Sequence, residues 1–315
     1  MSPTLSEWVI VMITYQNYYL QGRLGNCYYL AAIAGCATGG NDVLLKDVCI
    51  ENYGNVGLYG VKFFINGKWA TVIVDDRIPC EKVGSGWKPI FASPKMHSGQ
   101  QKGEKELWPM IFEKAWAKLH LSYEATAGGL TQDACSYLSG GLTSVRNLER
   151  GSDNTDIWDE CVALTAADGG DTFAFLSCAV RDDGDPSHLG LITGHAYSIL
   201  RLVKAKDGHK FVQIRNPWGE SEWKGDYCDS SPLWTPALKK ELGHEAEEDG
   251  AFFMSWEHFV MWFESIEICD ATGLMKMTEG ELCRVDGFSS HWSAPDFQSA
   301  KYRFCHHCIL RKAVV

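Results

Sequence analysis

With 315 residues, 45% of them hydrophobic and 22% charged, the chain is long enough to bury a sizeable core and to form two domains. Its formal net charge of −11 argues against a nucleic-acid or anionic-membrane partner, because both are themselves negatively charged. No apolar span reaches the roughly 18 residues that a membrane helix needs, so no transmembrane segment is expected. The short apolar stretch at 8–13 lacks the basic flank of a signal peptide.

The first informative segment, 21–32, places Cys27 directly before an alanine-rich apolar run. Gly22 and Gly25 permit a tight backbone here, and we expect Cys27 to lie in the first turn of a helix. A helix N-terminus carries about half a positive charge and free N–H groups, which favour a thiolate and can hold an oxyanion. Cys27 is therefore the candidate nucleophile, and the Gln21 amide with the backbone N–H of Cys27 is the candidate oxyanion hole.

The rest of the first half predicts a hairpin and two helices. Strand-like runs flank the dipeptide Asn66-Gly67, which is typical of a two-residue hairpin turn. Apolar residues recur at helical spacing from 108 to 120 and predict an amphipathic helix, and a further helical segment is expected at 157–166. The glycine-rich polar segment 167–171 follows and is the expected boundary between two subdomains.

Beyond this boundary, apolar and β-branched runs predict an antiparallel sheet or barrel. The runs are 172–180, 194–203, 210–216, 251–256 and 265–269. We therefore expect an α+β fold, with a helical subdomain at 1–169, a β-rich subdomain at 170–270 and a tail at 271–315.

Two of these predicted strands carry residues that would suit a cysteine nucleophile. His195 follows Gly194 near the start of one strand, Asn216 ends the next, and the short loop between the strands allows them to pair. His195 would share a proton with Cys27 and then protonate the leaving amine, while the Asn216 amide would orient the ring. Trp218 is expected to cover the hydrogen bond between His195 and Asn216.

Four motifs in this order, QG-x-LG-x-C, GHAYS, IRNPWG-x-x-EW-x-G-x-Y and EEDGAFFMSWEHF, resemble the protease core of the calpains, a branch of the papain-like cysteine proteases. The likeness covers about 19–269 and implies a papain-like two-lobed fold, in which a helical lobe faces an antiparallel β lobe across the substrate cleft. Asn26 and Tyr28 depart from the family, which usually has aspartate and tryptophan there. The site residues implied by the resemblance are the catalytic Cys27, His195 and Asn216, the oxyanion donor Gln21, and Trp218 and Gly194 beside the substrate.

Calpain cores bind calcium in both lobes, and the resemblance implies one candidate site here. Its β-lobe ligands, a hard-oxygen set suited to calcium, are the carboxylates of Glu222, Asp229 and Asp249 and the carbonyl of Glu247. Ala251 stands where a further acidic ligand is usual, and Tyr18 and Ser136 replace acidic ligands of the helical lobe. We therefore expect weak calcium binding in the β lobe, little in the helical lobe and no organic cofactor. The alternative is that 241–250 is only a solvated acidic loop.

The tail at 271–315 resembles at most the opening of the β-sandwich that often follows the calpain core. Its cluster Cys305, His306, His307 and Cys308 contains the residue types that bind zinc. Four adjacent residues cannot all face one tetrahedral ion, so we expect no zinc site there.

The expected function is that of a calpain-type endopeptidase that cleaves proteins or peptides and is modulated by calcium; the sequence identifies no regulatory subunit. Two other classes stay open. A transglutaminase-like acyl transferase shares the Cys–His order but would want aspartate in place of Asn216, and the altered residues Asn26 and Tyr28 keep open an inactive scaffold that binds partners. The twelve cysteines form no repeating disulfide framework, and a nucleophilic thiolate needs reducing surroundings, so we expect the cytoplasm.

Overall fold

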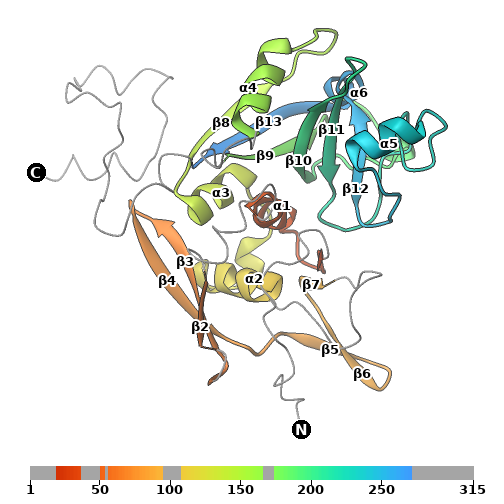
Figure 1. The fold of residues 1–315 in the computed structure, drawn as a ribbon. Coiled ribbons are helices and arrows are strands. Elements are labelled where there is room, and N and C mark those ends of the chain that lie inside the picture. Colours follow the sequence, from red (N-terminus) through yellow and green to blue (C-terminus); the bar gives the residue numbers. More distant parts are fainter. Residues whose placement is uncertain (1–18, 37–49, 54–55, 95–107, 166–173, 272–315) are drawn as a thin grey trace, which may run out of the picture.

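A computed structural model describes residues 19–36, 50–53, 56–94, 108–165 and 174–271 (Figure 1). It combines helices with antiparallel sheets, which confirms the α+β class. In the described ranges, no helix is both long and apolar enough to cross a membrane. The helices are α1 (Cys27–Cys36), α2 (Trp108–Leu119), α3 (Thr131–Ser139), α4 (Thr155–Thr165), α5 (Pro236–Leu242) and α6 (Trp256–Trp262), with single 3₁₀ turns at Glu124–Thr126 and Ser187–Leu189.

A six-stranded antiparallel sheet has the strand order β12-β11-β10-β9-β13-β8. Its strands are β8 (Leu142–Asn147), β9 (Ala174–Val180), β10 (Ala196–Lys204), β11 (Lys210–Arg215), β12 (Ala251–Ser255) and β13 (Phe263–Asp270). Five of them coincide with the predicted runs, so those predictions are confirmed. The strand β8 was not predicted.

The smaller sheets are formed by strands that precede α2 in the chain. A three-stranded sheet has the order β2-β3-β4, and two short pairs join β1 to β7 and β5 to β6. These strands are β1 (Tyr19–Leu20), β2 (Ile50–Tyr53), β3 (Leu58–Ile65), β4 (Lys68–Asp75), β5 (Cys80–Val83), β6 (Gly86–Pro89) and β7 (Ser93–Pro94). The predicted hairpin is confirmed, because Ile65 pairs with Lys68 across Asn66 and Gly67, which have φ of 51° and 75°. Both angles suit the two central positions of a type I′ turn.

The two faces of the six-stranded sheet pack against different helices. Along β9, Leu176 belongs to a cluster that includes Trp158 of α4, whereas its neighbour Phe175 belongs to a cluster with α1, α2 and α3. On β10, Tyr197 faces the α4 side, and Ser198 Oγ donates to a carbonyl of α1. This alternation is what a pleated strand between two packed layers requires. Helices α4 and α1 thus cover opposite faces (Figure 1).

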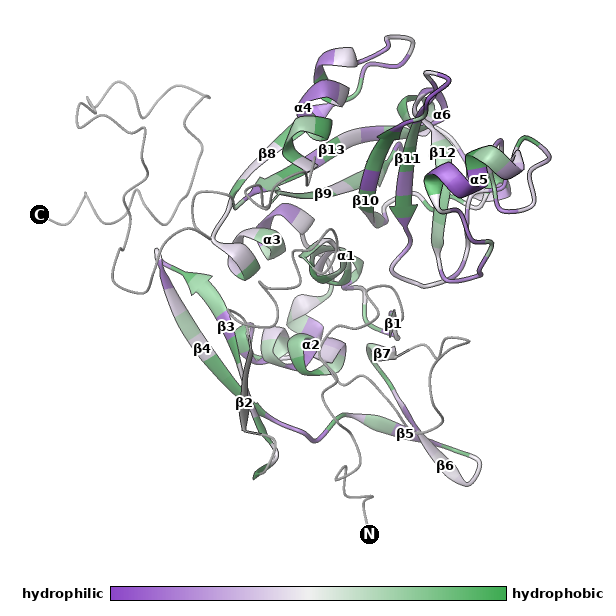
Figure 2. Cartoon of the chain, in the orientation of Figure 1, coloured by the Kyte–Doolittle hydropathy of each residue, from purple (hydrophilic) through white to green (hydrophobic). Residues whose placement is uncertain are grey.

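Helix α1 lies in the middle of the molecule and is apolar on all sides (Figure 2). Every residue from 28 to 36 is buried, as expected of a helix that has no solvent-facing side. The ring of Tyr29 stacks on Trp116 of α2 at 4.7 Å between centroids. The position of the helix N-terminus is therefore fixed by packing around the whole helix.

The predicted subdomain boundary at 167–171 lies outside the described residues, as do Tyr18 and the Cys305–Cys308 cluster. Two elements that precede residue 169 nevertheless belong to the large sheet. Strand β8 pairs with β13, and α4 packs on β9 and β10 through the cluster that contains Trp158. The sheet thus takes elements from both sides of residue 169.

Candidate active site

Cys27 is the first residue of α1 and is half-buried. The helix begins here because the carbonyl of Asn26 accepts the N–H groups of Tyr29 and Leu30, at 3.0 and 3.2 Å. The first two N–H groups of the helix, those of Cys27 and Tyr28, have no earlier turn to bond to and lie at the positive end of the helix dipole. The thiol therefore lies where a nucleophile and an oxyanion would both be favoured.

His195 and Asn216 lie at the adjacent ends of two paired strands. His195 directly precedes β10 and Asn216 directly follows β11, and their side chains are joined by a hydrogen bond of 2.8 Å between Nε2 and Oδ1. His195 is 5% exposed, and Asn216 is fully buried. The structure therefore brings these two predicted site residues together.

The hydrogen bonds of Asn216 determine which atom faces the imidazole. Its Nδ2 donates to the carbonyls of Glu220 and Ser221, at 2.7 and 3.1 Å, and its Oδ1 also accepts the backbone N–H of Trp218 at 3.0 Å. Since Oδ1 can only accept, Nε2 of His195 is the donor and carries the proton. In the neutral ring, Nδ1 is then free of its proton and is able to accept one.

The surroundings of His195 favour the uncharged form of the ring. Burial lowers the pKa of the imidazole, and the hydrogen bond to Asn216 offsets part of this effect. The ring of Trp218 lies 4.7 Å from the imidazole, between centroids, and is 37% exposed, so it shields one side of the His195–Asn216 pair. Gly194, the residue before His195, has φ of 66° and open space where a side chain would begin.

Cys27 and His195 do not form a hydrogen bond in the structure as described. Their elements are nevertheless in contact, because Ser198 Oγ on β10 donates to the carbonyl of Ala31 on α1 at 3.0 Å. The backbone N–H of Gln21 donates to the carbonyl of Pro217 at 3.1 Å, which ties the segment before α1 to the loop after Asn216.

The side chain of Gln21 does not point its amide donor at an open oxyanion site. Its Nε2 donates to the carbonyl of Leu24 at 2.6 Å, and its Oε1 is buried without a partner among the described residues. A role as oxyanion donor would require this amide to turn. The sequence motif gave the position of Gln21 but could not give this rotamer.

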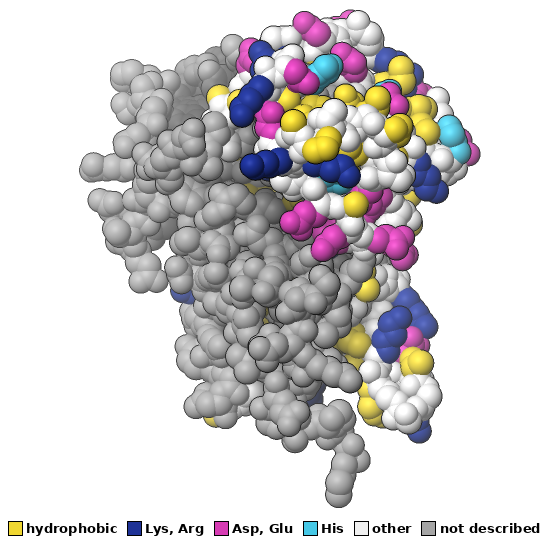
Figure 3. Space-filling model, turned by 45° about the vertical axis from the view of Figure 1, so that its right-hand side comes forward, with side chains coloured by type: hydrophobic (Ala, Val, Ile, Leu, Met, Phe, Trp, Pro, Cys, Tyr) yellow, Lys and Arg dark blue, Asp and Glu magenta, His cyan; other side chains and the backbone are white. Residues whose placement is uncertain are grey.

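The candidate calcium ligands lie in the chain segments before and after α5 (Pro236–Leu242). Figure 3 shows acidic side chains gathered on one face of the molecule. Burial, followed by repulsion from the neighbouring carboxylates, raises the pKa of Glu222 to about 7 and that of Asp229 to about 6. Glu222 accepts the N–H of Gly250 at 2.7 Å, and Asp249 accepts the N–H of Ala251 at 2.8 Å. The three carboxylates therefore repel one another, a cost that a bound cation would offset.

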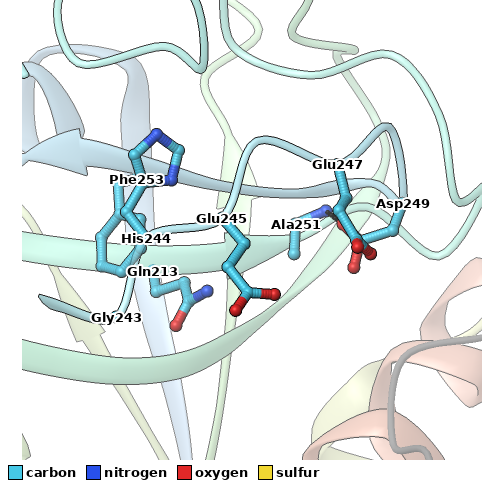
Figure 4. A pocket seen from close by; sticks show the side chains of 8 residues that line it. All are labelled: Gln213, Gly243, His244, Glu245, Glu247, Asp249, Ala251 and Phe253. Atoms are coloured by element: carbon cyan, nitrogen blue, oxygen red, sulfur yellow. Dashed lines mark hydrogen bonds between the residues drawn. The ribbon is translucent and has the colours of Figure 1, made fainter. Parts of the chain in front are cut away.

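A cavity of about 190 Å³ lies on one side of these ligands and is lined by Glu245, Glu247 and Asp249 among other residues (Figure 4). The carboxylates of Glu247 and Asp249 stand at one end of it, and the His244 imidazole is turned away from them. As the side chains stand, no three His, Cys, Asp or Glu groups of the described chain are close enough together to hold a metal ion.

Sequence reasoning missed a buried carboxylate behind α1. Glu113 lies on α2, is 2% exposed, and accepts from Asn26 Nδ2 at 2.7 Å and from the Ala92 N–H at 2.9 Å. Burial raises its pKa to about 7. The available signal was an acidic residue within the predicted helix at 108–120, on the side of the apolar residues. A carboxylate in such a position is seldom fully buried unless other groups bond to it, so it indicates a buried polar contact.

The raised pKa of Glu113 predicts a pH dependence of stability. Because this pKa is about 7 in the folded protein and near 4.5 when the chain is unfolded, the folded state holds the proton more tightly. The resulting stabilisation is complete below about pH 4.5 and is lost as the pH rises through about 7, with an amplitude of up to about 3 kcal/mol. Comparing urea unfolding of Glu113→Gln and the parent from pH 5 to 8 isolates this group. The free energy of unfolding should fall more steeply in the parent, and parallel curves would contradict the assignment.

Tyr28, the second departure beside the nucleophile, is also held by hydrogen bonds. Its hydroxyl accepts from Trp116 Nε1 at 3.0 Å and donates to the carbonyl of Thr126 at 3.2 Å. Tyr28→Phe leaves the buried indole N–H unpaired, so we expect a loss of about 1–3 kcal/mol in the free energy of unfolding, measured with urea. Tyr123→Phe is the control, because no hydrogen bond of the Tyr123 hydroxyl exists in the described part; equal losses in both variants would rule out the explanation.

The sequence is similar to those of known proteins. A family model for calpain family cysteine proteases matches residues 6–270. The calpain-type cysteine protease DEK1 of Zea mays is 40% identical over 259 residues, which cover 79% of this chain and 11% of the relative. Calpain clp-1 of Caenorhabditis elegans is 34% identical, covering 80% of this chain and 32% of the relative, and Calpain-9 of Mus musculus is 33% identical, covering 80% and 36%.

The chain thus spans about a tenth of the plant relative's length and about a third of the animal relatives' lengths. The family match covers most of the chain and includes the segments that carry Cys27, His195 and Asn216. From this match, together with the fold, we conclude that the chain belongs to the calpain family of cysteine proteases.

Proposed function

We propose that the chain is an active cysteine endopeptidase that cleaves protein substrates through Cys27, His195 and Asn216. The observation that carries the proposal is the buried hydrogen bond from His195 Nε2 to Asn216 Oδ1, on strands that pack against the helix that Cys27 begins. Membership of a protease family supports proteins as the substrate class.

In the proposed reaction, His195 Nδ1 takes the thiol proton of Cys27 while Asn216 keeps the ring oriented through Nε2. The sulfur attacks the carbonyl carbon of the peptide, and the negatively charged oxygen is held by N–H groups at the start of α1, joined by Gln21 if its amide turns. His195 then protonates the leaving amine as the C–N bond breaks. Water hydrolyses the thioester, which releases the acid and restores the thiol.

The proposed reaction needs a hydrogen bond between the Cys27 thiol and His195 Nδ1, which the structure as described does not contain. We propose two lobes, one with Cys27 and one with His195 and Asn216, which approach each other before catalysis. The second lobe includes β8 and α4 although they precede residue 169, because β8 pairs with β13 and α4 packs on β9 and β10. Calcium is the proposed modulator, because Glu222, Asp229 and Asp249 supply hard oxygen donors whose mutual repulsion a divalent cation would offset. The Glu247 carbonyl, which already accepts the Asp249 N–H at 2.9 Å, is the fourth proposed donor.

The calcium proposal predicts one weak site. Titration calorimetry of the Cys27→Ala protein should give a single Kd on the order of 10⁻⁴ M or weaker, because Ala251 supplies no carboxylate and the helical lobe has Ser136 in place of an acid. Asp249→Ala should abolish binding. Glu248→Ala, which removes an adjacent exposed acid, should leave it unchanged. Two tight sites would refute this proposal.

Hydrolysis of an unfolded protein in a thiol buffer, with and without calcium, tests the proposed function. The expected result is cleavage that the Cys27→Ala variant lacks. Transfer of an acyl group to an added amine without net hydrolysis would favour a transglutaminase-like enzyme, and no turnover under either condition would favour the scaffold alternative.

We also propose the cytoplasm as the location, since the eight described cysteines are all free thiols. Fractionation of cells that express the chain tests this location.

A further inference from the structure

A buried carboxylate reaches the residue before the proposed nucleophile. Glu113 Oε1 accepts from Asn26 Nδ2 at 2.7 Å, and both side chains are almost fully excluded from solvent, with exposed fractions of 2% and 0%. Glu113 Oε2 accepts the N–H of Ala92 at 2.9 Å. One carboxylate thus links α2, the segment before β7 and the start of α1.

Asn26 joins this carboxylate to the first turn of α1. Its backbone carbonyl accepts from the N–H groups of Tyr29 and Leu30, and its side chain donates to Glu113. If the hydrogen bond to Glu113 were lost, the Asn26 side chain would no longer fix the backbone of Asn26, which is directly followed by Cys27. Positional errors of about 1 Å at a reacting atom can cost on the order of a hundredfold in rate.

No ion pair involves Glu113 within the described residues. Lys114, which follows it on α2, pairs instead with Asp75 at 2.5 Å. The titratable side chain that faces Glu113 is Tyr123, whose pKa is raised by burial and then by the Glu113 and Asp75 charges. The carboxylate is therefore held by hydrogen bonds, and one of its two donors is the residue before Cys27.

We propose that Glu113 is a positioning residue for Cys27: through Asn26 it fixes the first turn of α1 and thereby the direction of the thiol. This inference rests on the proposed protease function. It predicts that what matters is the hydrogen bond between positions 26 and 113, and that the charge on Glu113 is dispensable.

Substitutions can separate the effect of the hydrogen bond between positions 26 and 113 from the effect of the charge on Glu113. Asn26 Oδ1 is buried and has no hydrogen-bond partner in the part of the chain described, so a half-turn of its amide presents this oxygen to position 113. In Glu113→Gln, the new amide can then donate to Asn26 and still accept from Ala92. Glu113→Met, of similar length, removes both bonds. Asn26→Ala removes the bond from the other side and leaves the carboxylate on Ala92.

The experiment measures kcat and KM for a peptide substrate with these three variants and the parent, at temperatures where thermal melts show each to be folded. Glu113→Met and Asn26→Ala should lower kcat at least about tenfold with KM changed by less than about twofold, because thiol direction acts on chemistry and not on peptide binding. Glu113→Gln should keep kcat within about threefold of the parent.

Glu267→Met is the matched control. Glu267 is a half-buried acid on β13 that accepts from Ser177 Oγ at 3.0 Å, and it lies on another element from Asn26. It should lower thermal stability while leaving kcat near that of the parent. Unchanged kcat in Asn26→Ala, or equal losses in Glu113→Gln and Glu113→Met, would overturn the inference. A parent without hydrolytic activity would instead refute the proposed protease function.

Discussion

Cys27→Ala is expected to reduce peptide hydrolysis to the background rate, a loss on the order of a million-fold. The thiol is the only group in the proposed reaction that forms a bond to the substrate, so neither His195 nor Asn216 can replace it. Hydrolysis of a fluorogenic peptide at saturating substrate measures the effect. Cys27 is half-buried, so its replacement should change the melting temperature little.

Cys80→Ala provides the control for removal of a thiol. Cys80 lies on β5, is exposed, and is remote in the chain from the residues of the proposed reaction. Its kcat should match that of the parent. Hydrolysis by Cys27→Ala at more than a trace of the parent rate would show that another residue is the nucleophile.

Asn216→Ala is expected to lower kcat on the order of a hundredfold and to change KM little. The Asn216 oxygen holds the imidazole through Nε2, so without it the ring is free to rotate away from the thiol. Since the amide contacts the imidazole and not the substrate in the proposed reaction, binding should be spared. Steady-state kinetics with a peptide substrate separate the two parameters.

The Asn216 side chain also holds its own loop through the carbonyl groups of Glu220 and Ser221, so a loss of loop structure must be distinguished from a loss of ring orientation. Glu220→Ala is the control, because only the backbone of this exposed residue takes part. It should retain the parent kcat. If Asn216→Ala raised KM alone, the orienting role would be wrong.

The elements that could be predicted are those whose signal is local in the sequence. The apolar stripe of α2, the Asn66-Gly67 turn and the apolar run after Cys27 each specify a structure through neighbours within one or two turns of chain. The adjacent ends of β10 and β11 were also predictable, because a short loop joins the strands that carry His195 and Asn216.

Features that depend on distant partners could not be predicted. Strand β8 is an edge strand whose side chains are mostly exposed or half-buried, so its sequence shows no apolar alternation, and its partner β13 lies more than a hundred residues further on. The bond between Asn26 and Glu113 joins positions 87 residues apart. The rotamer of Gln21 is fixed by the hydrogen bond of its amide to the Leu24 carbonyl, which sequence spacing does not determine.

The central claim, that Cys27 is the reactive thiol, is tested most directly by labelling the parent with a substrate-like peptidyl epoxide and mapping the modified peptides. Of the described cysteines, five are buried, and burial raises the pKa of Cys161 and Cys178 among them, so few thiols can compete. The account predicts one equivalent of label, on Cys27, accompanied by loss of hydrolysis. Equal labelling of Cys80 or Cys228, or a fully labelled Cys27 with hydrolysis intact, would contradict it.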